Sequence, residues 1–259
     1  MKNKMPVVFV GHGSPMNAIE DNPYSRSWLD LGKKLEVPKA ILSVSAHWFT
    51  RGTKVNDSKT PAMIYDMYGF PDELYQLKYP APGSPELAYQ VRDLVGDFVT
   101  IDNNWGIDHG SWSVLHRVFP NADIPIVQLS VNAMLSPAEH FEIGQKLRPL
   151  RDEGVLIFGS GNVVHNLSRV DWRNNDGHPW AQEFDQYIFR AIQTGSFDDV
   201  IDYTKAGESA QLSVPSMDHF VPLLYVIGAS DANDEVLAFN EDCTLGSMSM
   251  TSYLFSQKA

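Results

Sequence analysis

Short apolar runs alternate along this chain with longer segments in which apolar residues recur at helical spacing. The runs predict strands at residues 7–10, 40–45, 99–102, 124–131, 155–158, 236–239 and within 247–255. The intervening segments predict helices, but none separates the last two strands. Alternating strands and helices are typical of an α/β sheet covered on both faces, and the missing last helix predicts that the sheet is mixed.

Local signals mark the ends of three predicted helices. Ser136 opens a Ser-Pro-Ala-Glu sequence typical of a helix start, and Gly154 follows the last turn of the segment 136–150. A second helix is predicted at 179–194, where aromatic and aliphatic residues lie near helical spacing. We expect Ser216 to cap a third helix, whose apolar residues point inward.

One stretch departs from the alternation of strands and helices. Residues 60–85 interleave prolines with tyrosines and show no clear periodicity. An ordered loop of this length tends to be functional, so we expect a lid or a wall of a binding site. The alternative is a surface excursion whose tyrosines pack on the body of the protein.

Composition narrows the class of protein. Of the 259 residues, 43% are hydrophobic, which is typical of a globular chain, and the formal net charge of −12 argues against a nucleic-acid partner. No apolar stretch approaches the roughly 20 residues that span a membrane, and the N-terminus shows no signal-peptide pattern. A lone Cys243 excludes an internal disulfide. We therefore expect a cytoplasmic protein.

Four of the eight histidines lie at or near the edges of predicted buried elements. His12 and His47 follow apolar runs, His165 comes a few residues after another, and His219 opens a fourth. Ligands bind at the carboxyl ends of the strands in open α/β sheets. Imidazoles brought there from distant parts of the chain indicate an assembled metal site.

The neighbours of these histidines refine the prediction. His12 stands between Gly11 and Gly13, which allow a backbone to approach a ligand closely, and this favours a metal-binding or catalytic role. His165 follows the sequence Gly-Ser-Gly at 159–161, which we expect to turn into a helix. A phosphate cradle is the alternative, but the Walker lysine is absent, so a catalytic histidine fits better.

The remaining histidines divide into one candidate and three structural residues. His109 follows Asp108 near a helix start and could bind substrate, or it could belong to a turn anchored by two tryptophans. We interpret His116, His140 and His178 as structural, with His140 on the exposed side of the helix 136–150. No Gly-x-Ser-x-Gly elbow is present to indicate a serine hydrolase.

Six motifs resemble one known family. They occupy residues 11–17 (GHGSPMN), 45–52 (SAHWFTRG), 79–85 (YPAPGSP), 105–112 (WGIDHGSW), 160–167 (SGNVVHNL) and 222–229 (PLLYVIGA). In this order they resemble the bacterial 4,5-DOPA extradiol dioxygenases. These are class III extradiol ring-cleavage enzymes related to the catalytic subunit of protocatechuate 4,5-dioxygenase. The resemblance spans nearly the whole chain.

The resemblance implies a fold, a metal and a reaction. It implies one catalytic domain over residues 1–259, with a single-domain three-layer α/β/α fold and a mixed, mostly parallel central sheet. It implies a non-haem metal, Fe(II) for ring cleavage, with Zn(II) as an alternative occupant of the same site. The implied substrates are O2 and a catechol such as L-DOPA, with no nucleic acid or membrane partner.

Roles carry over residue by residue. His12 and His47 match the two metal-binding histidines of the family, and His165 matches the histidine beside the metal that acts as acid and base. His109 matches a histidine near the substrate. His219 falls where the related enzymes place their third ligand, a glutamate. The expected metal set is therefore His12, His47, His165 and His219, with His165 and His109 as the catalytic residues.

The absence of the glutamate leaves two alternatives open. Ring-cleaving oxygenases use two histidines and one carboxylate, whereas an all-imidazole site also suits zinc. A zinc-dependent hydrolase that activates water is one alternative, and a non-catalytic metal-binding protein on the same scaffold is the other. Whether His165 binds the metal, moves a proton or does both stays open at this stage.

Overall fold

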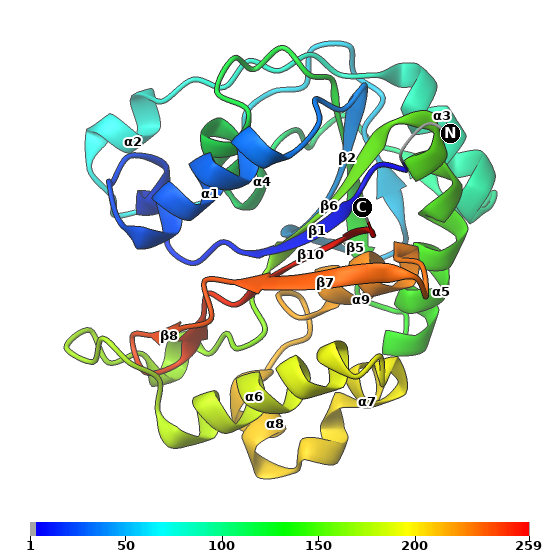
Figure 1. Ribbon diagram of the computed structural model, residues 1–259. Coiled ribbons are helices and arrows are strands. Elements are labelled where there is room, and N and C mark those ends of the chain that lie inside the picture. The colour runs from blue at the N-terminus through cyan, green and yellow to red at the C-terminus, as the bar shows by residue number, and fades with distance from the viewer. Residues whose placement is uncertain (1–3, 259) are drawn as a thin grey trace.

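The apolar runs form the strands of one central sheet in the computed structural model, which describes residues 4–258 (Figure 1). Its strands are β1 Val7–Gly11, β2 Ala40–Thr50, β3 Lys54–Val55, β4 Thr100–Ile101, β5 Ile126–Asn132, β6 Val155–Gly161, β7 Asp234–Phe239 and β10 Ser252–Gln257. Two short strands, β8 Cys243–Thr244 and β9 Met248–Ser249, pair with each other outside this sheet.

The sheet is mixed and mostly parallel, as predicted. Its strand order is β4-β3-β5-β2-β6-β1-β10-β7. The central strands β5, β2, β6 and β1 run parallel to one another. The last two strands, β10 and β7, are antiparallel to their neighbours, because no helix carries the chain back between them. The central strands therefore end together at one edge of the sheet.

Helices cover both faces of the sheet. They are α1 Pro23–Lys34, α2 Asp72–Gln76, α3 Pro85–Val95, α4 His109–Val118, α5 Pro137–Leu147, α6 Pro179–Gln193, α7 Phe197–Ile201, α8 Glu208–Ser213 and α9 Val221–Ala229. One layer contains α1 and α4, and the other contains α3, α5 and α9, with α6 to α8 grouped beyond α9 (Figure 1). This is the three-layer α/β/α fold that was expected. Within residues 4–258, none of these helices combines the length and apolar character that a membrane crossing requires.

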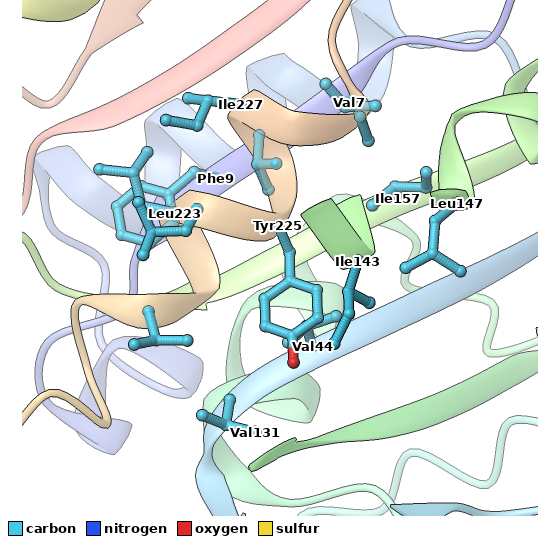
Figure 2. Packing of buried hydrophobic residues seen from close by; sticks show 14 of the residues in the cluster. Val7, Phe9, Val44, Val131, Ile143, Leu147, Ile157, Leu223, Tyr225 and Ile227 are labelled. Atoms are coloured by element: carbon cyan, nitrogen blue, oxygen red, sulfur yellow. The ribbon is translucent and has the colours of Figure 1, made fainter. Parts of the chain in front are cut away.

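Burial on both faces explains why the central strands are continuously apolar. Val7 and Phe9 of β1 pack with the α9 side of the molecule, whereas Val8 and Val10 pack with the α1 and α4 side. Figure 2 shows Leu223 of α9 beside Phe9 in the first of these cores. The rigid strands hold their carboxyl ends, and the residues that follow them, in fixed positions.

The capping signals were correct for the helix that begins after Ser136 and wrong for the helix expected after Ser216. Ser136 caps α5 in a reciprocal capping box with Glu139, and Gly154, with φ of 87°, ends the 3-10 turn that follows. Ser216 does not cap the third helix, because α9 begins at Val221. Pro222 lacks an N–H and is tolerated only in the first turn, which places the helix start later than predicted.

Two further predictions were wrong. The Gly-Ser-Gly sequence does not turn into a helix: β6 continues to Gly161, and the Asn162 N–H donates to the His219 carbonyl. His140 is fully buried, not exposed. Gly144 lets α5 approach α9 so closely that an added Cβ would lie 2.4 Å from the Tyr225 carbonyl oxygen, and this turns His140 toward the Tyr225 hydroxyl.

Candidate metal centre and its cavity

Five histidines gather near the carboxyl edge of the central strands. His12 follows β1 directly, His47 lies in β2, and His165 follows β6. His109 is the first residue of α4, and His219 lies just before α9. Because β1, β6 and β2 are adjacent and parallel, their ends meet in space. The structure thus brings together every histidine that the sequence proposed for a site.

His12 and His47 form the centre of this group. Their Nε2 atoms are 3.1 Å apart. His47 lies where the pairing of β2 with β5 shifts register between Val44 and Phe49, an irregularity of the kind that re-aims side chains next to active sites. The sequence analysis ended this strand at residue 45, but β2 continues to Thr50.

The glycines beside His12 allow a close approach of Met250, and Gly13 also lines the cavity over the histidines. An added Cβ on Gly11 would lie 2.8 Å from the backbone of Met250. Gly13 has a φ of 60°, in the left-handed region, and its Cβ position would lie 2.4 Å from the Met250 sulfur. Met250 thus packs closely against the backbone on either side of His12, at the end of β1.

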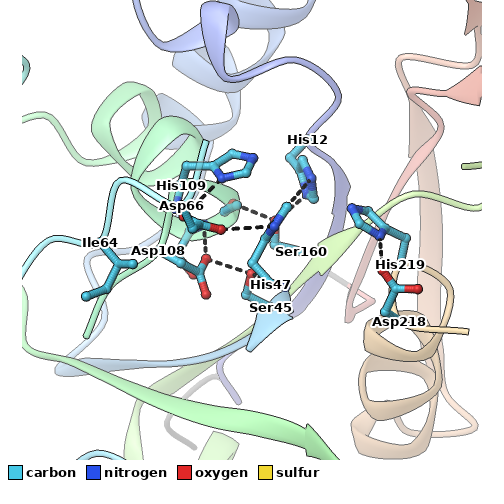
Figure 3. A network of polar contacts seen from close by, with 12 residues as sticks. His12, Ser45, His47, Ile64, Asp66, Asp108, His109, Ser160, Asp218 and His219 are labelled. Atoms are coloured by element: carbon cyan, nitrogen blue, oxygen red, sulfur yellow. Dashed lines mark hydrogen bonds and ion pairs between the residues drawn. The ribbon is translucent and has the colours of Figure 1, made fainter. Parts of the chain in front are cut away.

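Asp66 braces two of the histidines at once. Its Oδ2 lies 3.0 Å from His47 Nδ1, and its Oδ1 lies 3.1 Å from His109 Nδ1. Oδ1 also accepts a 3.0 Å hydrogen bond from the backbone N–H of His109 (Figure 3). The His109 ring contact lies within ion-pair distance but does not meet hydrogen-bond criteria. One carboxylate from the 60–85 segment thus orients residues of β2 and α4.

His219 faces the His12–His47 pair from the side opposite His109 (Figure 3). Its ring centroid lies 5.3 Å from that of His12 and 5.0 Å from that of His47. Its Nδ1 lies 2.6 Å from the Asp218 carboxylate, whereas its Nε2 is buried without a hydrogen-bond partner. A buried nitrogen without a hydrogen-bond partner costs free energy. A hydrogen-bond donor or a metal ion beside Nε2 would offset that cost.

The partners of the Nδ1 atoms determine where the Nε2 lone pairs point. Nδ1 of His47, His109 and His219 each faces a carboxylate. An ionised carboxylate can accept a hydrogen bond but cannot donate one. Nδ1 of His12 lies 3.0 Å from the Ser160 hydroxyl, which itself donates to the Gly110 carbonyl. These partners favour the tautomer with the proton on Nδ1, which leaves the Nε2 lone pair available to bind a metal.

This geometry fits a bound cation. The Nε2 atoms of His12 and His47, 3.1 Å apart, are stabilised either by one proton shared between them or by a cation beside both. His12, His47 and His109 each offer a nitrogen within 4.8 Å of the others, and imidazole donors suit iron and zinc. The expected metal at His12 and His47 thus has a donor set suited to it.

Burial keeps most of the cluster neutral. Burial, and then the neighbouring histidines, hold the pKa values of His12 and His165 well below their usual range. Burial also lowers the pKa of His219 to about 4, against the opposing effect of Asp218. His47 differs: burial opposes its charging, but Asp66 and Asp108 raise its pKa overall. Neutral imidazole is the form that binds a metal.

His165 lies parallel to His219 at the side of the cluster. Their ring centroids are 3.5 Å apart with an interplanar angle of 5°. The backbone N–H of His165 donates to the Ser213 carbonyl, and its side chain is half-buried and lines the cavity. His165 is therefore more accessible to a ligand than His219 behind it.

A cavity of about 500 Å³ opens over the histidines. This volume lies within the range of small-molecule sites. The 60–85 segment supplies part of its wall, as predicted, and the segments after β1, β6 and β8 supply further parts. Its apolar lining includes Met67, Phe70, Leu167, Val170, Leu245 and Met248.

Asp66 is the functional candidate that the sequence analysis missed. Asp108 was considered there as a partner of His109, but it caps α4 and accepts hydrogen bonds from Ser45 and Trp105. The partner that faces the His109 ring is Asp66. A signal did exist, because Asp66 is the only charged residue between positions 60 and 71 of a segment predicted to be functional.

Comparisons with known proteins agree with the site. Residues 7–255 match the family model of the catalytic LigB subunit of aromatic ring-opening dioxygenase. A 4,5-DOPA dioxygenase extradiol of Escherichia coli K12 is 48% identical over 96% of this chain and 94% of its own length. The protein of that name from Beta vulgaris is 40% identical over 96% of this chain and 95% of its own.

A solved structure has the same fold. The crystal structure of an uncharacterized protein from Escherichia coli K12 superposes with a TM-score of 0.85 and 44% identity, covering 97% of this chain and 99% of the other. The fold, the histidine cluster and the match over residues 7–255 coincide. The chain belongs to the LigB family of aromatic ring-opening dioxygenases.

Proposed function

We propose that this protein is an extradiol dioxygenase that cleaves the ring of a catechol such as L-DOPA. In this reaction the ring bond next to a hydroxyl-bearing carbon breaks, and both atoms of O2 enter the product. The observation that supports it most strongly is the His12–His47 pair, whose Nε2 atoms are 3.1 Å apart. The relatives named 4,5-DOPA dioxygenase extradiol support the substrate. We propose that residues 1–259 form one catalytic domain.

We assign the metal to His12, His47 and His219. The first two place their Nε2 atoms 3.1 Å apart, and the third has a buried Nε2 with no hydrogen-bond partner. Fe(II) is the proposed metal for ring cleavage, because it can exchange electrons with O2, whereas Zn(II) would bind here without redox chemistry. Two further histidines remain candidates for a ligand: His165, which stacks on His219, and His109, which offers a nitrogen within 4.8 Å of those of His12 and His47.

We assign proton transfer to His165. It lines the cavity and is half-buried, and within residues 4–258 its ring has no hydrogen-bonded acid or base. A neutral imidazole in this position can take a phenolic proton from the catechol and return it to the product, a role suited to a histidine near neutral pH. The parallel ring of His219 holds the His165 ring in one orientation.

His109 is assigned to the substrate. Asp66 accepts from its backbone N–H and lies 3.1 Å from its Nδ1, which leaves Nε2 to hydrogen-bond an oxygen of the substrate. The apolar wall of the cavity excludes water from the ring of the catechol. The protein thus orients the substrate between the histidines and an apolar surface.

Oxygen uptake tests the proposal directly. Apo-protein would be reconstituted anaerobically with Fe(II) or with Zn(II), mixed with L-DOPA and exposed to O2. We expect oxygen consumption matched to catechol loss and a yellow product in the iron sample alone. No uptake with iron across a panel of catechols would reject the dioxygenase and favour the zinc hydrolase or the non-catalytic protein, which the all-imidazole donor set also suits.

His165→Ala separates its two candidate roles. As an acid and base, His165 should be needed for oxygen uptake but not for metal content, which can be measured by atomic emission. Loss of the metal together with activity would make His165 a ligand instead. His116→Gln is the matched control, because His116 lies on α4 outside the cavity and should leave both measurements unchanged.

A further inference from the structure

Apart from the histidines, the described residues that line the cavity carry charge of one sign only, which is negative. Among the described residues that line it, none is lysine or arginine, and Asp66 is the only carboxylate. A carboxylate on a bound ligand would therefore lose its hydration without gaining a cationic partner inside the protein, and burial of an unpaired charge is costly. The net charge of −12 adds a long-range repulsion of anions.

The rim of the cavity is aromatic. Tyr68 and Trp172 both line it, yet they are 92% and 80% exposed. They come from separate segments, before α2 and after β6, so they border the opening from different parts of the chain. Large exposed apolar side chains beside a cavity mark a binding surface. Aromatic faces also attract ammonium groups.

The nearest arginines by sequence lie outside the lining. Arg169 and Arg173 flank the cavity residues Val170 and Trp172, but both are exposed and neither lines the cavity. Arg173 lies 3.8 Å from Asp171. Neither arginine therefore contributes a cation to the wall of the cavity.

We propose that the cavity selects catechols whose side arm is neutral or carries an ammonium group, and excludes catechols with a carboxylate directly on the ring. The arm leaves the cavity past Tyr68 and Trp172. This inference rests on the proposed function, because it places a catechol ring at the histidines. It narrows the substrate class to catechols with an uncharged, cationic or zwitterionic arm.

Binding to Zn(II)-loaded protein tests the proposal without any need for turnover. Protocatechuate and its methyl ester have nearly the same shape, but only the acid carries a charge on the ring. Isothermal titration should show the ester binding at least about tenfold more tightly than the acid. Equal affinities would overturn the proposal. Binding of the ester with no oxygen uptake in the iron enzyme would instead reject the dioxygenase function alone.

A charge placed in the lining should reverse the preference. Val170 lines the cavity and is half-buried, so Val170→Lys supplies the missing cation. We expect the ester-to-acid affinity ratio to fall by about tenfold, with Val170→Met as the uncharged control. An unchanged ratio in a folded Val170→Lys protein would contradict the proposal. The wild-type ratio still decides the matter if this variant does not fold.

The aromatic rim has its own test. Dopamine and 4-ethylcatechol share a ring and a two-carbon arm, but only dopamine carries an ammonium group at its end. Trp172→Leu should weaken the binding of dopamine about threefold relative to the binding of 4-ethylcatechol. An exposed cation–π contact contributes an affinity of about this size. Arg169→Ala should leave this comparison unchanged. Equal effects of Trp172→Leu on both ligands would remove the rim from recognition of the ammonium group.

Discussion

Arg151 and the histidine cluster are buried polar groups at opposite ends of the central strands. Arg151 precedes β6, its side chain is fully buried, and it donates to the carbonyls of Met5 and Ala229. It also pairs with Asp231 and Asp234. The N–H groups of Arg151 thus donate to acceptors within the protein itself.

The histidine cluster is satisfied only on its outer side. Nδ1 of His12, His47 and His219 each lies beside a hydroxyl or a carboxylate, but the Nε2 atoms of His12 and His47 face each other, and that of His219 has no partner. Asp66 and Asp218 stabilise the rings without completing the cluster. A structural cluster closes on itself, whereas a binding site leaves several donor atoms converging on one place.

Arg151 offers the largest expected effect on stability. Arg151→Met would leave the buried Asp234 carboxylate and the Met5 carbonyl without their partner. Removing one member of a buried ion pair costs about 3–5 kcal/mol, and urea unfolding would measure this loss. Metal content should stay unchanged in the protein that folds. A parallel loss of metal would break the separation between the two clusters.

His219→Ala tests whether the unpaired Nε2 in the histidine cluster binds the metal. Removing a ligand should weaken metal binding by more than about 100-fold, the upper range for loss of a ligand's outer partner. His109→Ala is the matched variant and should lower activity while the metal stays bound. Chelator competition with Zn(II) measures both. Metal lost from His109→Ala and kept by His219→Ala would give the third position to His109, which lies within 4.8 Å of the His12 and His47 nitrogens.

Asp66→Asn measures how much the carboxylate beside the His47 and His109 rings contributes to metal affinity. The amide cannot accept from both rings as a carboxylate does, so His47 and His109 lose their common brace. We expect metal affinity to fall by about 10- to 100-fold with little change in unfolding free energy. Asp57→Asn, at an exposed hydrogen-bonded aspartate, is the control. A large loss of stability without loss of affinity would make Asp66 a structural residue.

His140 provides the smallest effect, as a buried histidine that does not line the cavity. Burial lowers its pKa from 6.5 to about 4. The unfolded chain therefore binds a proton that the folded state resists, and the stability contributed by neutral His140 is lost as pH falls below 6.5. From pH 7 to 5.5 this contribution falls by roughly 1 kcal/mol. His140→Gln should reduce the pH dependence of unfolding by that amount, and an identical pH dependence would contradict this role.

Local signals predicted much of the fold. The apolar run of β1, the capping box at Ser136 and the glycine after η2 (Arg148–Glu153) each depend on neighbouring residues, and the structure confirms them. The prediction for β2 ended too early, because the irregular pairing around His47 follows from its partner β5. The burial of His140 depends on the approach of α5 to α9, which no pattern within α5 reveals.

The sequence by itself determined the family, the α/β alternation and the histidines that meet at the sheet edge, because apolar periodicity and short motifs are local properties. Only the tertiary structure decided which atoms of those histidines are free. That choice is made by Asp66, Ser160 and Asp218, and two of these contact rings far away in the sequence. Such contacts leave no periodic trace in the chain, since they arise only when separate strands and loops pack together.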